Sequence, residues 1–598
     1  MDEEKRNNII LDKIINFIFS NDERKWLILI VLLGAILRFI VLSNVSPLAD
    51  EMVYGTHPIN IINSGVINEQ NECPVWFYLT DIAYKTLGVN AFAGRFLSFF
   101  FGILTILIVY LIGKKIFGRK AALIAAFLLS ISAYHISNTL MEMDEAMIFF
   151  VLFSFYLFIK NLKDKNQLSY LSVILIAIAV LIKPIALTFA LPFLLYFLFF
   201  IYKQPVEKRK EFLNKNYKRI ILSAILFILF MMPILAYNII LYKQKGITDI
   251  QFARFFKVNP EIFAGLGGYN LSFSITVLFS QGLFTAFKYF FLFQDPAIFL
   301  LSIGGIFVIF LNKKYKPGRT IVLMHLIPFI FLAGTALLET HFVSFIPLLS
   351  LSAAAFISFA SEILKEKKNQ KILIYGILAL VFLVNLCLLM PHMTSKSAIF
   401  KMRNYAVQNL HEKDIIVADA RIYRGRIAWM FNDKPYIESS LFPQIFSTNQ
   451  NLSGQPISST VYFVECVPDD CGWGTIKDQP EFNQSTEQFF DYIKNNSIKE
   501  KIFLGGGGYD AQKDYPYFIV YKTTINIHPQ IYSYIYQTHD WFYYPVRWAK
   551  NDWYDKYYPE GTLQFLLNSA GKLFLWIAIL LALLSPILLI RELIKEVQ

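Results

Sequence analysis

Acidic side chains gather in two short stretches that each border a long apolar run. Asp50 and Glu51 lie in LADEMVYGTHP, a few residues after the first apolar run ends. Glu142, Asp144 and Glu145 lie in NTLMEMDEAM, directly before a later run begins. Ionisable groups beside hydrocarbon are costly and usually mark a site, so these clusters suit a base and a clamp for a metal ion or substrate. The alternative is carboxylates solvated at helix starts, where the helix dipole favours them.

Cationic side chains occur near the ends of other apolar runs on the same predicted face. Arg38 lies in the outer half of the first run, and Arg95 lies one turn into the second. Lys183 ends the fifth run and His341 opens the tenth. Snorkelling toward the membrane surface explains any one of them. Acids and cations together suit a pocket for an anionic lipid headgroup, because a departing phosphate needs positive charge where its negative charge develops.

The elements that position these residues are predicted to be transmembrane helices. The chain has 598 residues, of which 56% are hydrophobic and 17% are charged. A soluble protein with so many apolar residues would not have enough polar residues to cover its surface. A bilayer core needs ~20 apolar helical residues. Such runs give about twelve candidate spans by this criterion. They start near Trp26, Ala91, Ala121, Ala146, Leu168, Ile185, Ile220, Phe287, Thr320, Phe342, Ile372 and Leu566.

The distribution of Lys and Arg predicts the orientation of these spans. Twenty-nine Lys and Arg residues lie in residues 1–25, 113–120, 160–167, 203–219, 313–319, 363–371 and 591–598. The opposite short loops, residues 44–90, 138–145, 242–286 and 339–341, hold five. Cytoplasmic loops are the basic ones, so both termini are predicted to be cytoplasmic, with no cleaved signal peptide. This placement also accounts for the net charge of +12 without a nucleic-acid partner.

A stretch of different composition is predicted to form a small extracytoplasmic α/β domain. Strand-length apolar runs at 415–418, 461–464 and 517–521 alternate with polar, helix-like segments. We therefore divide the chain into a transmembrane domain (1–391), this α/β domain (392–562) and a last span with a cytoplasmic tail (563–598). Cys466 and Cys471 in ECVPDDCGW form either a short loop disulfide or two free thiols, and the sequence does not decide between them.

The order of these motifs resembles the GT-C integral-membrane glycosyltransferases, most closely the protein O-mannosyltransferase and aminoarabinose-transferase branch. The resemblance covers the first two hundred residues and a later segment, HFVSFIPLLSL. The motifs that carry it are Asp50-Glu51, CPVWFYL, Arg95 with Ser98, MEMDE and IKP. It implies a cell-membrane enzyme of the cell envelope that takes a sugar from a polyprenyl-phosphate or dolichyl-phosphate donor. The implied acceptor is a protein, lipid or glycan on the outer face, and the reaction is a single inverting displacement.

The resemblance also implies roles for individual residues. Asp50 is implied as the general base that removes the acceptor hydroxyl proton, with Glu51 beside it. A divalent metal ion held by Asp50 and Asp144 is left open, since members of this class differ in needing one. The positions implied in substrate binding are Asp144, Glu142, Glu145, Arg95, Lys183 and His341, the last three toward the lipid phosphate. Arg38 is expected only to pack and pair.

The chain also departs from the family pattern. It has Pro74-Val75-Trp76 where a double Pro is common, which puts a lipid-groove role of this stretch in doubt. Glu72 and Cys73 stand where the aminoarabinose branch tends to carry a basic residue, which argues against aminoarabinose as the sugar. The predicted soluble domain shows no threefold repeat of the kind expected for a β-trefoil.

Three other functions fit parts of the sequence. An oligosaccharyltransferase of the same class would carry Trp-Trp-Asp-Tyr-Gly, which neither HDWFYY nor NDWYDKYY matches. A transporter or flippase of lipid-linked saccharides would share a topology of twelve spans. It would, however, place Asp50 and Asp144 in a central pathway rather than in an outward pocket. A receptor whose soluble domain binds a partner would leave the charged span ends unexplained.

Overall fold

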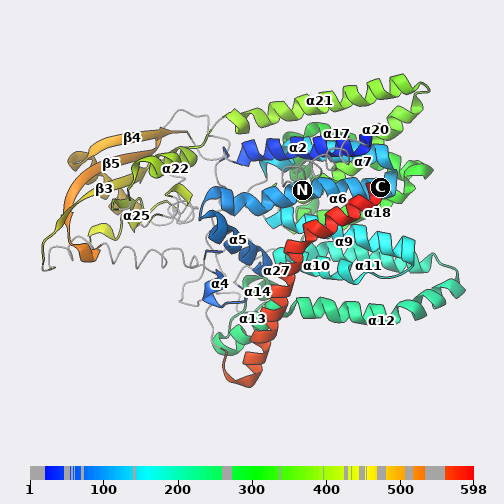
Figure 1. The fold of residues 1–598 in the computed structure, drawn as a ribbon, viewed down its shortest axis with the longest axis horizontal. Helices are drawn as coiled ribbons and strands as arrows, with labels where there is room; N and C mark the ends of the chain where they lie inside the picture. Colours follow the sequence, from blue (N-terminus) through cyan, green and yellow to red (C-terminus); the bar gives the residue numbers. More distant parts are fainter. Residues whose placement is uncertain are drawn as a thin grey trace, which may run out of the picture.

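The structure is a computed structural model that combines a helical bundle with a sheet domain at one end (Figure 1). The residues it describes are 21–42, 44–45, 54–55, 58–59, 61–68, 73–138, 143–258, 273–335, 339–394, 396–411, 413–422, 429–431, 434, 436–443, 452, 454–467, 480–505, 516–531 and 559–597. This architecture confirms the predicted fold class, a polytopic helical membrane protein with a small sheet-containing domain near the C-terminus.

Nine helical segments within the described ranges are long and apolar enough to cross a membrane, or ten if the bent pair α12 and α13 is one span. Two shorter apolar helices, α10 and α17, lie among them. The helices of the first half are α2 (Asp22–Leu42), α4 (Ile61–Ser64), α5 (Pro74–Leu87), α6 (Ala91–Phe117), α7 (Arg119–Ile131), α8 (Ala133–Ser137), α9 (Met143–Lys165), α10 (Tyr170–Ile182), η1 (Pro184–Ala186), α11 (Leu187–Tyr202), α12 (Val206–Phe230), α13 (Met232–Lys245) and α14 (Ile250–Phe256).

The second half of the bundle follows, and its last helix returns from the sheet domain. Its helices are α15 (Ile275–Val277), η3 (Leu278–Gly282), α16 (Leu283–Thr285), η4 (Ala286–Leu292), α17 (Pro296–Leu311), η5 (Lys313–Gly318), α18 (Arg319–Thr335), α19 (Glu339–Phe342), η6 (Val343–Phe345), α20 (Ile346–Ile363), α21 (Lys367–Thr394) and α27 (Gly561–Val597). In Figure 1, α27 runs obliquely across the bundle and ends away from the sheet domain.

Helix boundaries in the bundle follow from local sequence chemistry. Helix α10 ends at Ile182 and the next begins at Pro184, with Lys183 in an extended conformation between them. This break matches the prediction of two separate spans, because Pro disfavours a helical residue before it. Two other predicted spans differ from the helices in the structure. Helix α12 begins at Val206, so the basic stretch before Ile220 is also helical, and the span predicted near Ala121 is divided at Ser132.

The structure divides the span predicted to start near Phe287. One helical segment, partly π-helical, covers Ile275–Leu292, and α17 starts afresh at Pro296. Asp295 accepts a hydrogen bond from the Ile298 backbone N–H at 3.3 Å, and Pro has no N–H with which to continue the earlier helix. The first segment begins where Ser274 N–H donates to the Gly334 carbonyl and ends near Asp295.

The centre of the bundle is closely packed around α9, whose most apolar window is 89% buried. Helices α6 and α10 pack against it, and α7 and α20 pack against α6 and each other. Small residues allow the closest approaches, as is usual between membrane helices. At Gly305 of α17 an added Cβ would lie 1.8 Å from the Ser352 carbonyl oxygen of α20. Only glycine fits there, and the two backbones touch.

The sheet domain holds five strands in the order β2-β1-β3-β5-β4, with β1 parallel to β2 and β3 and the other pairs antiparallel. The strands are β1 (Ile415–Ala418), β2 (Ile437–Glu438), β3 (Ile457–Cys466), β4 (Ile498–Leu504) and β5 (Pro516–Ile527), and the helices are α22 (Ala398–Asn409) and α25 (Pro480–Asn496). Successive side chains of β1 point to opposite faces. Val417 packs with Phe490 of α25, whereas Ile416 belongs to the core shared with α22 and the bundle. The three predicted strand runs thus form the middle of the sheet.

Hydrogen bonds fix the sheet domain to one end of the bundle. The Trp429 indole N–H donates to the Tyr84 hydroxyl of α5 at 3.1 Å. After α21, the Ser397 backbone N–H donates to the carbonyl of Asn44, and the Asn44 amide donates to the Met393 carbonyl at 2.8 Å. Asn44 follows α2 directly, so the end of α2 and one end of α5 form the docking surface. We call this the sheet-domain end.

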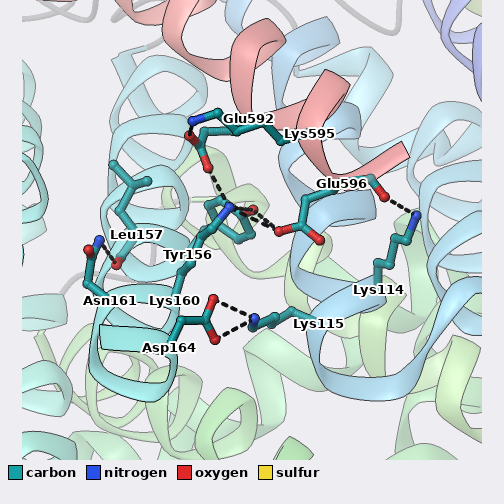
Figure 2. A network of polar contacts seen from close by, with 10 residues as sticks. All are labelled: Lys114, Lys115, Tyr156, Leu157, Lys160, Asn161, Asp164, Glu592, Lys595 and Glu596. Atoms are coloured by element: carbon teal, nitrogen blue, oxygen red, sulfur yellow. Dashed lines mark hydrogen bonds and ion pairs between the residues drawn. The ribbon is translucent and has the colours of Figure 1, made fainter. Parts of the chain in front are cut away.

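The basic segments lie together at the opposite end of the bundle. Lys160 of α9 pairs with Glu592 at 2.7 Å and with Glu596 at 3.0 Å, both near the end of α27 (Figure 2). Lys114 of α6 donates to the Glu596 carbonyl at 2.6 Å. Lys115 pairs with Asp164 at 2.9 Å. Basic segments far apart in sequence therefore meet at one end.

The cysteines differ between the two parts of the molecule. Cys466, at the end of β3, is disulfide-bonded. Cys73 and Cys387 of the bundle are not disulfide-bonded. Cys471 lies outside the described residues.

Candidate active site

An ion pair between α9 and the α10–α11 link forms the centre of the candidate site. Asp144 lies in the first turn of α9 and is completely buried, and its Oδ2 pairs with Lys183 Nζ. Lys183 is the C-cap of α10 and is 8% exposed. Ser344 Oγ donates to the other Asp144 oxygen at 3.4 Å. Two residues 39 positions apart in sequence thus meet because both lie at helix ends near the same side of the bundle.

His341 of α19 joins this pair. Its imidazole interacts electrostatically with both Lys183 and Asp144. Its Nδ1 is buried and has no hydrogen-bond partner within the described chain. The structure therefore brings together three residues that the sequence placed in substrate binding, with a histidine nitrogen able to bond to a ligand. A cation and an imidazole beside one carboxylate can bind and orient a phosphate group.

A second charged cluster lies beside the first. Glu145, the neighbour of Asp144, has Oε2 at 3.2 Å from His135 Nε2. His135 Nδ1 accepts a hydrogen bond from Arg38 at 2.7 Å. All three side chains are at most 1% exposed. Arg38, expected only to pack and pair, is thus connected to the acidic motif through His135.

A third polar group lies behind these residues. Asp295, the N-cap of α17, accepts a hydrogen bond from Ser132 Oγ at 2.5 Å. Asn385 of α21 accepts one from the Ala133 backbone N–H at 2.7 Å. Both bonds hold the break between α7 and α8, and that break leads directly into the short helix that carries His135.

Arg95 occupies a different place from Lys183 and His341. It is completely buried in α6, and its Nη1 donates to the carbonyls of Leu42 at 2.6 Å and Val45 at 2.9 Å. Its guanidinium also lies 5.4 Å from the Phe400 ring centroid and 5.9 Å from that of Trp429. Arg95 therefore fixes the end of α2 and Val45, which is five residues before Asp50, against the sheet domain.

Three predicted site residues, Asp50, Glu51 and Glu142, lie outside the described residues. Within the described ranges, no group of three or more His, Cys, Asp or Glu side chains is arranged to hold a metal ion. A site shared by Asp50 and Asp144 is therefore not tested by this geometry.

Comparison with known proteins identifies a family that matches part of the chain and solved structures with a similar fold. Residues 71–237, which include Arg95, Asp144 and Lys183, match the family described as Dolichyl-phosphate-mannose-protein mannosyltransferase. The solved structure of ArnT from Cupriavidus metallidurans bound to undecaprenyl phosphate matches with a TM-score of 0.50 at 12% identity, over 83% of this chain and 98% of that chain. The chain thus shares the overall fold of ArnT, and residues 71–237 are similar to the protein-mannosyltransferase family.

Two further proteins are similar over part of this chain. An oligosaccharyltransferase of Archaeoglobus fulgidus matches with a TM-score of 0.45 at 15% identity, over 75% of this chain and 70% of that one. An uncharacterized protein of Aquifex aeolicus (strain VF5) is 30% identical over 172 residues, which are 27% of this chain and 34% of that protein. The chain thus spans about a third of the length of that relative.

His135, Ser344 and Asp295 were not predicted from the sequence. Asp295 carries a local signal, since an Asp directly before a Pro is typical of a helix start. His135 is a lone histidine after an apolar run, and Ser344 is a lone serine at the start of one. Neither has a spacing that predicts its contact with Glu145 or Asp144.

Proposed function

We propose that this protein transfers a sugar from a polyprenyl-phosphate donor to an acceptor hydroxyl at the extracytoplasmic face of the membrane, with inversion. The GT-C fold and the family match over residues 71–237 support a membrane glycosyltransferase. The observation that carries the proposal is the buried Asp144–Lys183 pair with His341 beside it. It gives the sheet-domain end a preformed site for phosphate. The sugar is a hexose or pentose other than aminoarabinose, and the acceptor is a protein, lipid or glycan.

The proposed reaction is one displacement at the anomeric carbon. Asp50, with Glu51 beside it, takes the proton of the acceptor hydroxyl, and the acceptor oxygen forms the new glycosidic bond. The bond between the anomeric carbon and the phosphate oxygen breaks, and its electron pair leaves with the polyprenyl phosphate. The phosphate thereby gains one negative charge. Lys183 and His341 stabilise that charge as it develops, and Asp144 orients Lys183.

The remaining predicted residues have supporting roles in this proposal. Arg95 fixes the carbonyls of Leu42 and Val45, which lead into the segment with Asp50. Glu142, two residues before Asp144 in the sequence, is proposed to bind the donor. Glu145 acts through its contact with His135 rather than on the substrate directly.

The proposed orientation puts the sheet domain outside the cytoplasm. It is supported by the gathering of Lys114, Lys115 and Lys160 at the opposite end of the bundle, because basic loops are cytoplasmic. The disulfide at Cys466 also suits an oxidising compartment. Both chain termini are then cytoplasmic.

A transfer assay with purified protein in nanodiscs tests the proposal. Wild-type protein, Asp50→Asn and the control Asp164→Asn are incubated with a panel of polyprenyl-phosphate sugars and candidate acceptors. Asp164 pairs with Lys115 at the other end of the bundle. We expect the wild type and the control to transfer one sugar and Asp50→Asn to be at least about a hundredfold slower.

Two results would contradict the proposal. Equal rates for wild type and Asp50→Asn would remove Asp50 as the base. If no donor turned over but a lipid-linked saccharide crossed vesicles containing the protein, the transporter alternative would replace the transferase.

A further inference from the structure

Three buried charged or ionisable side chains have no direct part in the proposed displacement. Arg38 comes from α2, His135 from α8 and Glu145 from α9, and none is more than 1% exposed. Ionisable groups buried within a membrane bundle are costly to keep and usually serve function. Their position beside Asp144 suggests which function they serve.

Arg38 is held in one place by several acceptors. Its Nη1 donates to the carbonyls of Gly34 at 3.1 Å and Ser130 at 3.4 Å, and its Nη2 donates to that of Leu129 at 3.3 Å. These carbonyls belong to α2 and to the end of α7, so the guanidinium is anchored to the backbone of two helices. A cation anchored in this way can hold a neighbouring side chain in one position.

The contact with Arg38 fixes the tautomer of His135. Arginine can only donate hydrogen bonds, so His135 Nδ1, 2.7 Å from Arg38 Nη2, must be an acceptor. The proton of a neutral imidazole is then on Nε2, which lies 3.2 Å from Glu145 Oε2, a close contact whose angles are not those of a hydrogen bond. The order Arg38, His135, Glu145 therefore has a single polarity, from cation through imidazole to carboxylate.

Two adjacent carboxylates at the start of α9 thus face two separate cationic groups. Asp144 is paired with Lys183, and Glu145 interacts with His135 and with the charge of Arg38. A rotation of the first turn of α9 would disturb both contacts at once. The Arg38–His135–Glu145 chain therefore fixes the orientation of the Asp144 side chain toward Lys183.

Gly102 of α6 leaves room for this arrangement. A Cβ at position 102 would lie 3.3 Å from Arg38 Nε and 3.3 Å from Glu145 Oε2. That spacing is tighter than ordinary carbon contacts, so a methyl group there would displace one of the two side chains slightly. The glycine thus offers a way to disturb the chain without removing any charge.

We propose that Arg38 and His135 are positioning residues, which hold Glu145 and thereby set the Asp144–Lys183 pair for the departure of the phosphate. This inference rests on the proposed function. The phosphate gains charge as its bond to the sugar breaks, so a misplaced Lys183 weakens the transition state more than the bound donor. The loss is expected in kcat rather than in KM.

Two substitutions of His135 test the chain. In His135→Gln the amide oxygen accepts from Arg38 and the amide nitrogen donates to Glu145, so the polarity is kept. His135→Leu removes both contacts at similar bulk. We expect kcat to fall about thirtyfold in the leucine variant and by no more than about threefold in the glutamine variant, with KM for the donor within about threefold in both.

A second pair of variants keeps the test valid if His135→Leu does not fold. Gly102→Ala adds one methyl group against Arg38 and Glu145, whereas the control Gly376→Ala adds one on α21 with nothing within 4 Å. We expect Gly102→Ala to lower kcat at least about fivefold and Gly376→Ala to leave it unchanged.

The outcomes separate this inference from the proposed function. Wild-type kcat in folded His135→Leu and in Gly102→Ala, or a glutamine variant as slow as the leucine one, would overturn the inference and leave the transferase standing. A rise in donor KM at unchanged kcat would also overturn it, since that result indicates binding. No turnover by wild-type protein with any donor would overturn the proposed function itself.

Discussion

The bundle and the sheet domain each bury an aspartate against a cation, but they complete the pair differently. In the sheet domain, Asp419 follows β1 and accepts from Arg421 Nε at 3.0 Å, from Arg421 Nη2 at 2.7 Å and from the backbone N–H of Arg421 at 2.9 Å and of Cys466 at 3.0 Å. The pKa of Arg421 is raised, because the hydrogen bond and charge of Asp419 outweigh the effect of burial. In the bundle, Asp144 bonds to Lys183 and, weakly, to Ser344.

This difference separates a structural pair from one suited to a ligand. Arg421 is two residues from Asp419, so local chain geometry forms that pair and several donors complete it. Lys183 and Asp144 come from different helices, and a lysine is a point charge that can shift to another anion. Around them, the unpartnered Nδ1 of His341 and Oε1 of Glu145 leave bonding capacity among the described residues. Such capacity is costly in a finished core and useful in a binding site.

Breaking the sheet-domain pair should have the largest effect, and that effect should be on stability. Arg421→Met leaves Asp419 buried with only its backbone donors. We expect the sheet domain to lose about 3–5 kcal/mol of unfolding free energy, as is usual when one partner of a buried pair is removed. Hydrogen exchange at β1 and β3 measures this loss of unfolding free energy. Protection equal to that of wild type would show that the pair is not structural.

Breaking the bundle pair should mainly affect turnover. In Lys183→Gln the phosphate loses a fixed cation, which should slow transfer by about 10²–10³-fold. The transfer assay measures this loss. The double variant Asp144→Asn with Lys183→Gln removes the unpaired buried carboxylate, so it should unfold at a higher temperature than the single variant and remain slow. Recovery of both stability and rate would make this pair as structural as that of Asp419.

The junction between the two regions should contribute less. Trp429→Phe removes the hydrogen bond to the Tyr84 hydroxyl while keeping an aromatic ring near Arg95. We expect a loss of about 1 kcal/mol in the docking of the sheet domain. Faster hydrogen exchange at residues 429–431, with unchanged exchange in β5, would show it. Faster exchange throughout the sheet would instead indicate loss of the domain core.

The smallest effect is expected at the far end of the bundle. Lys160→Gln removes contacts with Glu592 and Glu596, all of which are partly solvent-exposed. Such pairs contribute roughly 0–1 kcal/mol and are screened by salt. The thermal midpoint of the detergent-solubilised protein should change little, and less at high salt. A large drop in that midpoint would show that this network holds α27 in place.

The sequence predicted those parts of the fold that depend on local pattern. Continuous apolar runs identify α6, α9 and α27, and β-branched runs identify β1. The segment Ile275–Leu292 could not be separated from α17, because one apolar window covers both and only the Asp295-Pro296 pair marks the break. Whether a helix of that length crosses or turns back depends on its neighbours, and composition does not encode them.

The candidate site was predictable to a similar extent. Asp144, Lys183 and His341 were identifiable because charges at helix ends on one face are rare. The contact between Arg38 and Glu145 through His135 was not identifiable, since it joins three elements whose distances only tertiary packing sets. The roles of Asp50, Glu51 and Glu142 remain predictions.

The route of α27 has a consequence for biosynthesis. Helix α27 packs against α13 and α5, and its Trp576 ring contacts Tyr78 of α5. The ribosome makes this helix after the sheet domain, so α5 and α13 lack their neighbour until the sheet domain has been made. A chain that stops before residue 561 would expose these helices to lipid or to quality-control proteases. Assembly of this part of the bundle therefore waits for a helix that is made after the sheet domain.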